Sequence, residues 1–275
     1  MFLDIRLIAM DLDGTALQKD RCYFSPRLLE ALNKAYERGI AIVPVTGRQF
    51  GLLPPVLQEV HPWKNLAVLC NGGQIRDMHT GAFLHRLDID PQALKQLLEV
   101  AEEFHLPIEF SVDSKLHLTQ EDWDRQLPWP DLAFHRNTIL ANRGCAVASL
   151  APMCGPGIEK VNLLCISAEK RQAVVQRLER IAVSAVWSSE TCMEITHPHA
   201  TKGNALQMLC RLLQIPVENV MALGDSGNDI TMLQQAGLGV AMGNAPDFVK
   251  AAANVCALRH DEDGAAIAVE TYALG

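Results

Sequence analysis

Runs of consecutive apolar residues alternate with amphipathic stretches in the first part of the chain. The apolar runs LIAM (7–10), IAIVPV (40–45) and LAVLC (66–70) have the composition of buried strands. Between the first two, SPRLLEALNKAYERG has apolar residues at helical spacing, with Ser25 as a predicted N-cap and Gly39 as a stop. Continuous apolar strands that alternate with amphipathic helices predict a parallel sheet covered by helices on both faces.

The pattern changes after Gly73, where apolar and polar residues begin to alternate singly, as they do in half-exposed antiparallel strands. The segments expected to form strands or helices here are 81–90, 91–106 (helix), 108–120, 158–167, 168–182 (helix), 184–189 and 192–196. Residues 121–157 have weak periodicity and predict no element. We therefore expect a separate α+β unit inserted into the parallel α/β domain.

The parallel pattern returns from Lys202 onward. The expected elements are a helix over 202–215, a strand over 217–226, a helix through Met232 and Leu233, a strand over 238–244, and helices after Pro246 and Asp261. The fold class predicted is thus a doubly wound α/β domain that is discontinuous in sequence. Residues 1–78 and 197–275 are expected to form this core, and residues 79–196 the inserted domain.

Composition, net charge and cysteine spacing exclude several classes of protein. A chain of 275 residues with 49% hydrophobic residues can bury two moderate cores, and its net charge of −8 argues against a general affinity for nucleic acid or anionic lipid. The eight cysteines form no C-x-x-C pair, which predicts reduced core residues. No secretory signal is predicted and no apolar run approaches the roughly 20 residues of a membrane span, so we expect a cytoplasmic protein.

Four polar clusters follow predicted strands. They are DLDGT (11–15), TGR (46–48), NGG (71–73) and GDSGND (224–229). Each alone is a weak signal, because an Asp-rich loop after a strand is most often a turn or a helix cap. In an open parallel sheet, however, the loops at the carboxyl ends of the strands form one crevice. The four clusters are therefore expected to meet at one edge of the sheet.

The first cluster supplies two carboxylates for different roles. Asp11 is the candidate nucleophile, since a carboxylate at a strand tip can attack phosphorus to give an aspartyl phosphate. Asp13 is suited to protonate the leaving oxygen and then to deprotonate the attacking water. Asp225 would join Asp11 in a hard oxygen site of the kind that Mg²⁺ prefers, and this metal would relieve the repulsion between the carboxylates.

The other clusters supply groups that can bind a phosphoryl group. Thr46, Lys202 and Asn228 offer a hydroxyl, a cation and an amide. A single lysine near the start of a helix is usually solvated. Lys202 is a candidate only because the four polar clusters accompany it. Asp229 is expected to orient Lys202 or a metal-bound water without itself contacting the metal.

These motifs resemble those of the haloacid dehalogenase superfamily, in particular its Cof-type (subfamily IIB) sugar-phosphatase-like branch. DLDGT, TGR, the lysine of ATKGNAL and GDSGND match its four motifs in order, and the insert resembles its C2-type cap, a substrate-specificity domain. The resemblance implies that Asp13 also binds Mg²⁺ through its carbonyl. It further implies phosphate contacts from the backbone of Leu12 and from Gly47.

The resulting prediction is a Mg²⁺-dependent phosphomonoester hydrolase acting on a small phosphorylated metabolite, such as a sugar phosphate or a broad range of phosphates. A phosphomutase or phosphotransferase would use the same aspartate but pass the group to another hydroxyl. A non-catalytic phosphometabolite sensor has no need of an acid/base at Asp13. A phospho-acceptor domain would be shorter and have no cap. The sequence predicts no oligomeric state.

Overall fold

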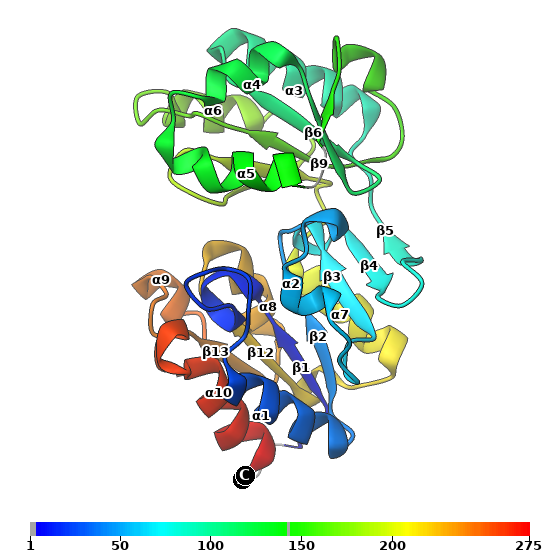
Figure 1. Cartoon of the computed structure of the whole chain (residues 1–275), viewed down its shortest axis with the longest axis vertical. Helices are drawn as coiled ribbons and strands as arrows, with labels where there is room; N and C mark the ends of the chain where they lie inside the picture. Colours follow the sequence, from blue (N-terminus) through cyan, green and yellow to red (C-terminus); the bar gives the residue numbers. More distant parts are fainter. Residues whose placement is uncertain (1–3, 142–143) are drawn as a thin grey trace. The chain divides into compact units, whose positions relative to one another are not determined.

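Two compact units make up the part of the chain that the computed structural model describes, residues 4–141 and 144–275 (Figure 1). The first unit takes in the chain up to Arg48, Leu53–Arg86 and Thr201–Gly275, and the second takes in Gln49–Leu52 and Leu87–Ala200. Apart from the short segment Gln49–Leu52, the chain passes between the units near residues 86 and 200, where the sequence predicted limits of 78 and 197. Every predicted site residue belongs to the first unit.

A five-stranded parallel sheet forms the centre of the first unit, which confirms the predicted α/β fold class. Its strands, in spatial order, are β14 (Val255–Cys256), β13 (Leu238–Ala241), β12 (Val220–Gly224), β1 (Leu7–Met10) and β2 (Ala41–Pro44). The register pairs Met10 with Leu223 on one side and with Pro44 on the other. The polar segments that follow β1, β2 and β12 therefore begin at the same edge of the sheet.

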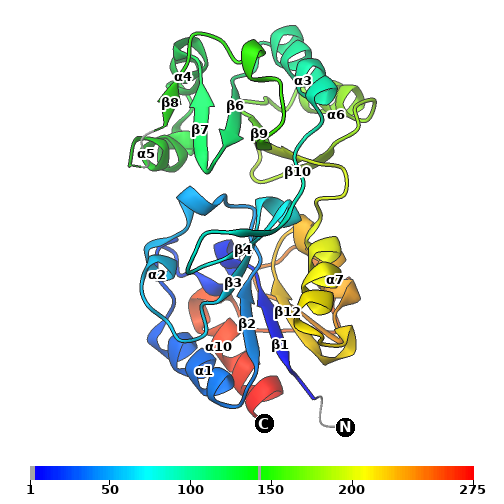
Figure 2. The same cartoon turned by 90° about the vertical axis from the view of Figure 1, so that its right-hand side faces the viewer.

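Helices cover both faces of this sheet. Figures 1 and 2 show α1 (Pro26–Glu37) with α10 (Gly264–Val269) on one face, and α7 (Lys202–Leu213) with α8 (Ile230–Gln235) on the other. Ser25 caps α1 as predicted, because its Oγ accepts a hydrogen bond from the backbone N–H of Leu28 at 3.1 Å. Two shorter helices, α2 (Pro55–Gln58) and α9 (Asp247–Lys250), complete the unit.

The third strand departs from the expected parallel arrangement. β3 (Leu66–Leu69) makes one parallel bridge to the main sheet, between Val45 and Val68, and otherwise pairs antiparallel with β4 (Gln74–Asp77). β4 in turn pairs with β5 (Phe83–Arg86). The prediction that residues 79–90 begin the inserted domain is therefore wrong for β5, because this strand completes an antiparallel sheet of the first unit.

The second unit is built on a six-stranded sheet. Its spatial order is β10 (Ser184–Trp187), β11 (Met193–Thr196), β9 (Ile158–Leu163), β6 (Ile108–Val112), β7 (Lys115–Leu118) and β8 (Cys145–Ala146). The helices α3 (Pro91–Phe104) and α6 (Arg171–Leu178) pack beside each other, and their apolar residues join those of β6 and β9 in one core (Figure 2). This α+β organisation confirms the type of insert predicted.

The stretch that predicted no element, residues 121–157, is partly helical. It holds most of α4 (Gln120–Gln126), all of α5 (Ala133–Ala141) and β8, and residues 142 and 143 of this stretch lie outside the described residues. α4 begins after Thr119, whose Oγ1 accepts a hydrogen bond from the backbone N–H of Asp122. The helix is short and mostly polar, so it carries no helical periodicity that the sequence could reveal.

Two further expectations concern the whole chain. The eight cysteines all lie within the described residues, and all are free thiols, as predicted. The prediction that they are core residues is wrong for four of them, since Cys22, Cys145 and Cys154 are half-buried and Cys256 is exposed. Over residues 4–141 and 144–275, no helix has both the length and the apolar character needed to cross a bilayer.

Candidate active site

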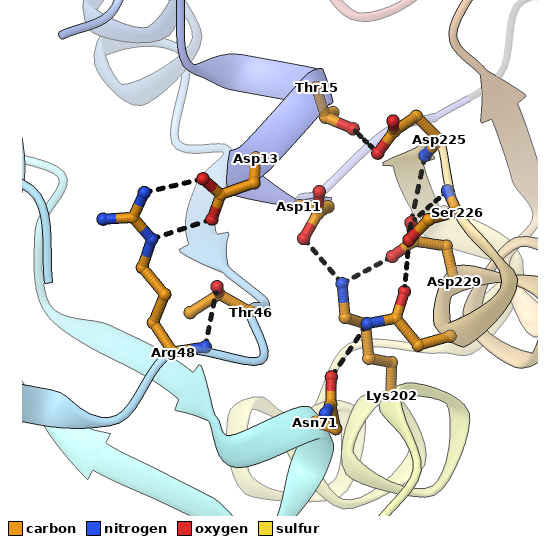
Figure 3. A network of polar contacts seen from close by, with 11 residues as sticks. Asp11, Asp13, Thr15, Thr46, Arg48, Asn71, Lys202, Asp225, Ser226 and Asp229 are labelled. Atoms are coloured by element: carbon orange, nitrogen blue, oxygen red, sulfur yellow. Dashed lines mark hydrogen bonds and ion pairs between the residues drawn. The ribbon is translucent and has the colours of Figure 1, made fainter. Parts of the chain in front are cut away.

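A buried lysine holds two aspartates together at the carboxyl edge of the parallel sheet. Asp11 follows β1 directly, and Lys202 is the first residue of α7. The Lys202 Nζ lies 2.6 Å from Asp11 Oδ1 and 2.6 Å from Asp229 Oδ1, and only 1% of the lysine is exposed (Figure 3). Residues from three separate segments thus form one charged cluster. The strand-end positions of Asp11 and Asp229 predicted that they would meet, and Lys202 joins them from the start of a helix.

Burial and repulsion change the pKa values of this cluster. Burial raises the pKa of Asp11 well above its ordinary value, and the charge of Lys202 opposes this rise. Burial also raises the pKa of Asp225 to about 6, with the negative charge of Asp229 as the next cause. For Lys202 burial acts to lower the pKa, but the charges of Asp11 and Asp229 outweigh it and raise the pKa above the usual range.

Asp229 supports the site from within the loop after β12. Its Oδ2 accepts hydrogen bonds from the backbone N–H groups of Asp225, at 3.0 Å, and Ser226, at 2.9 Å, while its Oδ1 faces Lys202. Asp229 is completely buried, and both of its oxygens are engaged. The residue therefore holds both the loop and the lysine in place.

Asp225 is held against the turn that follows Asp11. Its carboxylate accepts hydrogen bonds from Thr15 Oγ1 at 3.3 Å and from Asn244 Nδ2 at 3.1 Å. Asn244 also donates to the carbonyl oxygen of Gly14 at 2.9 Å. Gly14 has a φ of 79°, and a Cβ at this position would collide with the Asp225 carboxylate. Glycine is therefore required for the turn and the loop to approach this closely.

The carboxylates form a place suited to a divalent cation. Oxygen atoms of Asp11, Asp225 and Asp229 lie within 4.8 Å of one another, and among them Lys202 supplies one positive charge for three carboxylates. Hard oxygen donors with excess negative charge are what Mg²⁺ prefers. Asp229 is completely buried, and its oxygens are held by the Lys202 ammonium and by two backbone N–H groups. Asp11 and Asp225 fit better as ligands, because Asp225 is only half-buried and accepts hydrogen bonds from the neutral side chains of Thr15 and Asn244.

Asp13 lies in the same turn but faces a different partner. Arg48 binds its carboxylate in a bidentate manner, with Nε at 2.7 Å from Oδ2 and the terminal nitrogen at 2.6 Å from Oδ1. Figure 3 shows the Asp13 carboxylate turned toward Arg48 and away from Asp11. Arg48 belongs to the TGR motif, but the sequence predicted no role for it. Its place two residues after Thr46, at the end of a predicted strand, could have indicated that it lies near the site.

The remaining predicted residues surround the cluster. Thr46 is buried and its Oγ1 accepts a hydrogen bond from the backbone N–H of Arg48 at 3.1 Å. Asn228 Nδ2 donates to Asn71 Oδ1 at 2.8 Å, and Asn228 Oδ1 accepts from Ser226 Oγ at 2.6 Å. The other two predicted residues lie beside these: Leu12 directly after Asp11 and Gly47 between Thr46 and Arg48.

Five residues with defined contacts in the site were missed by sequence reasoning: Thr15, Arg48, Asn71, Ser226 and Asn244. Four of them belong to the quoted motifs, so their position along the chain was a signal. The partners of Thr15, Arg48, Asn71 and Asn244 could not be predicted, because these hydrogen bonds join segments that tertiary folding brings together. Ser226 instead bonds to Asn228, two residues further along the same motif. Asn244 belongs to the segment that follows β13.

The chain is similar to known proteins over nearly its whole length. A family model of haloacid dehalogenase-like hydrolases matches residues 8–269. Pyridoxal phosphate phosphatase YbhA from Escherichia coli (strain K12) is 32% identical over 261 residues, which cover 91% of this chain and 92% of that protein. The solved structure of a haloacid dehalogenase-like hydrolase from B. subtilis is 29% identical, with a TM-score of 0.83 over 97% of this chain and 99% of its own.

A second solved structure shows likeness of fold alone. The subclass IIB sugar phosphatase BT4131 is 22% identical, with a TM-score of 0.83 over 98% of this chain and 100% of its own. BT4131 thus shares with this chain the architecture of a parallel α/β unit that carries an inserted α+β unit.

The raised pKa of Asp225 predicts that the stabilisation of the folded protein by Mg²⁺ depends on pH. Without metal, a carboxyl group whose pKa is higher in the folded than in the unfolded protein stabilises the fold at acid pH, and this contribution is lost as pH rises from 3.8 to about 6. A cation competes with that proton. Mg²⁺ at about 100 times its Kd should add about 2.7 kcal/mol to the free energy of unfolding at neutral pH.

The increase in Tm with Mg²⁺ should therefore be larger at about pH 7.5 than at about pH 5, and Asp225→Asn should abolish it. Thermal melts with and without Mg²⁺ at both pH values measure this. Asp4→Asn, which changes an exposed aspartate preceding β1, is the matched control. An equal response at the two pH values, or one that survives in Asp225→Asn, contradicts the assignment.

Proposed function

The chain belongs to the haloacid dehalogenase-like hydrolase family, and we propose that it is a Mg²⁺-dependent phosphomonoesterase whose Asp11 forms an aspartyl phosphate. The observation that carries the proposal is the buried Lys202 between Asp11 and Asp229, with Asp225 beside them. A lysine in this place neutralises part of the carboxylate charge, which would otherwise repel an approaching phosphate dianion.

In the first half of the proposed reaction, an oxygen of Asp11 attacks phosphorus. A new bond forms between that oxygen and phosphorus, and the bond between phosphorus and the ester oxygen breaks. Asp13 gives its proton to the departing oxygen, which leaves as an alcohol. Asp11 is supported as the nucleophile because Lys202 holds its carboxylate at the strand tip and only 5% of the residue is exposed.

In the second half, water attacks the phosphorus of the aspartyl phosphate. Asp13, now a carboxylate, takes a proton from this water, and the bond between phosphorus and Asp11 breaks to release inorganic phosphate and the free aspartate. The pair with Arg48 supports this role, since the bidentate contact holds the Asp13 carboxylate in one orientation within the turn that follows Asp11. To serve as the acid, the Asp13 side chain must first leave Arg48.

Five further groups are assigned to the phosphoryl oxygens in this proposal: the backbone of Leu12, Thr46 with Gly47, Lys202 and Asn228. All of them belong to segments that follow β1, β2 and β12 or begin α7. Asp11, Asp225 and the carbonyl of Asp13 are the groups proposed to hold Mg²⁺. When bound, Mg²⁺ supplies positive charge that offsets the repulsion between the nucleophile and the phosphate.

We propose a small phosphorylated metabolite as the substrate, with the second unit as the domain that selects it. A relative at 32% identity is named for pyridoxal phosphate, and the resemblance of the motifs favours sugar phosphates, so a range of small phosphate esters is the proposal. The intact acid/base at Asp13 supports hydrolysis over a sensor. The eight free thiols support a reducing, cytoplasmic location.

Removal of the nucleophile should abolish turnover. Asp11→Asn keeps nearly the same side-chain volume but cannot attack phosphorus, so the release of phosphate from p-nitrophenyl phosphate should fall by at least about 10⁴-fold. EDTA should suppress the activity of the native protein and Mg²⁺ restore it. A colorimetric phosphate assay measures both effects, with Asp4→Asn as the matched control. Native activity in Asp11→Asn, or activity indifferent to EDTA, contradicts the proposal.

The acid role of Asp13 predicts a dependence on the leaving group. An alkyl alcohol needs a proton to depart, whereas p-nitrophenolate does not. Asp13→Asn should therefore lower kcat/KM for an alkyl phosphate by about 10²–10⁴-fold and for p-nitrophenyl phosphate much less. Steady-state assays with both substrates measure the ratio. Equal losses for both substrates would mean that Asp13 does not act as the acid, and an isomerised product in place of phosphate would favour a mutase.

A further inference from the structure

The turn of Cys70, Asn71 and Gly72, which includes the first two residues of the NGG motif, has a backbone conformation that is unfavourable for residues other than glycine. Cys70, Asn71 and Gly72 have φ values of 52°, 55° and 104°, all in the left-handed region. Glycine adopts this region freely and asparagine tolerates it, but cysteine rarely does. Consecutive residues of this kind persist only where the surrounding structure fixes them, and they are frequent at functional sites.

Backbone contacts hold this turn against two segments of the active site. The N–H of Cys70 donates to the carbonyl of Arg48 at 3.1 Å, and the N–H of Asn71 donates to the carbonyl of Thr46 at 3.1 Å. On the other side, a Cβ at Gly72 would collide with the carbonyl oxygen of Thr201, the residue before Lys202. The turn is therefore fixed between the TGR segment and the start of α7.

The side chain of Asn71 reaches a third segment. It is 2% exposed, and its Oδ1 accepts a hydrogen bond from Asn228 Nδ2 at 2.8 Å. The other end of the Asn228 amide accepts from Ser226 Oγ at 2.6 Å. Both ends of this amide are thus fixed, which sets the plane of the group and the direction of the second N–H on Asn228 Nδ2.

We propose that Asn71 is a positioning residue for phosphate binding, which acts by aiming the second N–H of Asn228 at a phosphoryl oxygen. This inference rests on the proposed function, in which Asn228 binds the phosphoryl group. Backbone geometry alone would be best served by glycine at position 71, because φ is positive there. An asparagine at this position brings a buried hydrogen-bond acceptor to Asn228, although its backbone is more strained at positive φ than that of glycine.

The substitution Asn71→Gly separates the two roles. Asn71→Gly removes the hydrogen bond to Asn228 but fits the left-handed backbone, and these effects offset each other, so the Tm should stay near that of the native protein. Its affinity for phosphate should fall about tenfold. Asn71→Ala should lose the same affinity but melt below Asn71→Gly, because it keeps a Cβ at positive φ. Calorimetric titration of Mg²⁺-loaded protein with inorganic phosphate, together with thermal melts, measures both quantities.

Gln214→Gly is the matched control. Gln214 is an exposed residue at the far end of α7 with a φ of 54°, so it offers the same relief of backbone strain away from the site. Its phosphate affinity should equal that of the native protein. Unchanged affinity in Asn71→Gly, or a loss that comes with a lower Tm, overturns the inference, as does native protein that binds no phosphate. Phosphate binding without ester hydrolysis in the native protein would instead overturn the proposed function alone.

Discussion

The ion pairs of Lys202 with Asp11 and Asp229 are the interaction on which the rest of the site depends. Three charged groups lie buried together, and removing one partner of a buried pair costs about 3–5 kcal/mol because the other charge is left without compensation. This arrangement is stable only if the end of β1, the start of α7 and the loop after β12 meet at one point. The fold satisfies this requirement through the parallel register that aligns the strand ends.

The surplus of negative charge explains the chemistry proposed for the site. One lysine faces two carboxylates directly, and Asp225 adds a third that burial drives toward protonation. A divalent cation relieves this repulsion and favours the approach of a phosphate dianion. Around this centre the polypeptide supplies orientation: Gly14 allows the turn to approach Asp225, and the two backbone N–H groups bound to Asp229 fix the loop.

Much of this arrangement could be predicted because it follows from local patterns. Apolar runs predicted the parallel strands, and the motifs at the ends of these strands predicted that Asp11 and Asp225 would be neighbours. Lys202, near the start of a predicted helix, was predicted only as a member of the whole set. Partner choice was not predictable in the same way. The pairing of Arg48 with Asp13 and of Asn71 with Asn228 depends on side chains meeting across loops, for which no periodicity exists. β5 was assigned to the wrong unit for a similar reason, since its alternating pattern fits any antiparallel partner.

The central claim is that phosphate is transferred to Asp11 itself, and trapping the acyl phosphate tests it most directly. Native protein is quenched during turnover of p-nitrophenyl phosphate with Mg²⁺, reduced with borohydride to convert an aspartyl phosphate into homoserine, and mapped by peptide mass spectrometry. The account predicts homoserine at position 11 and at no other aspartate. Reduction at another carboxylate, or phosphate release with no reducible intermediate under single-turnover conditions, would contradict it.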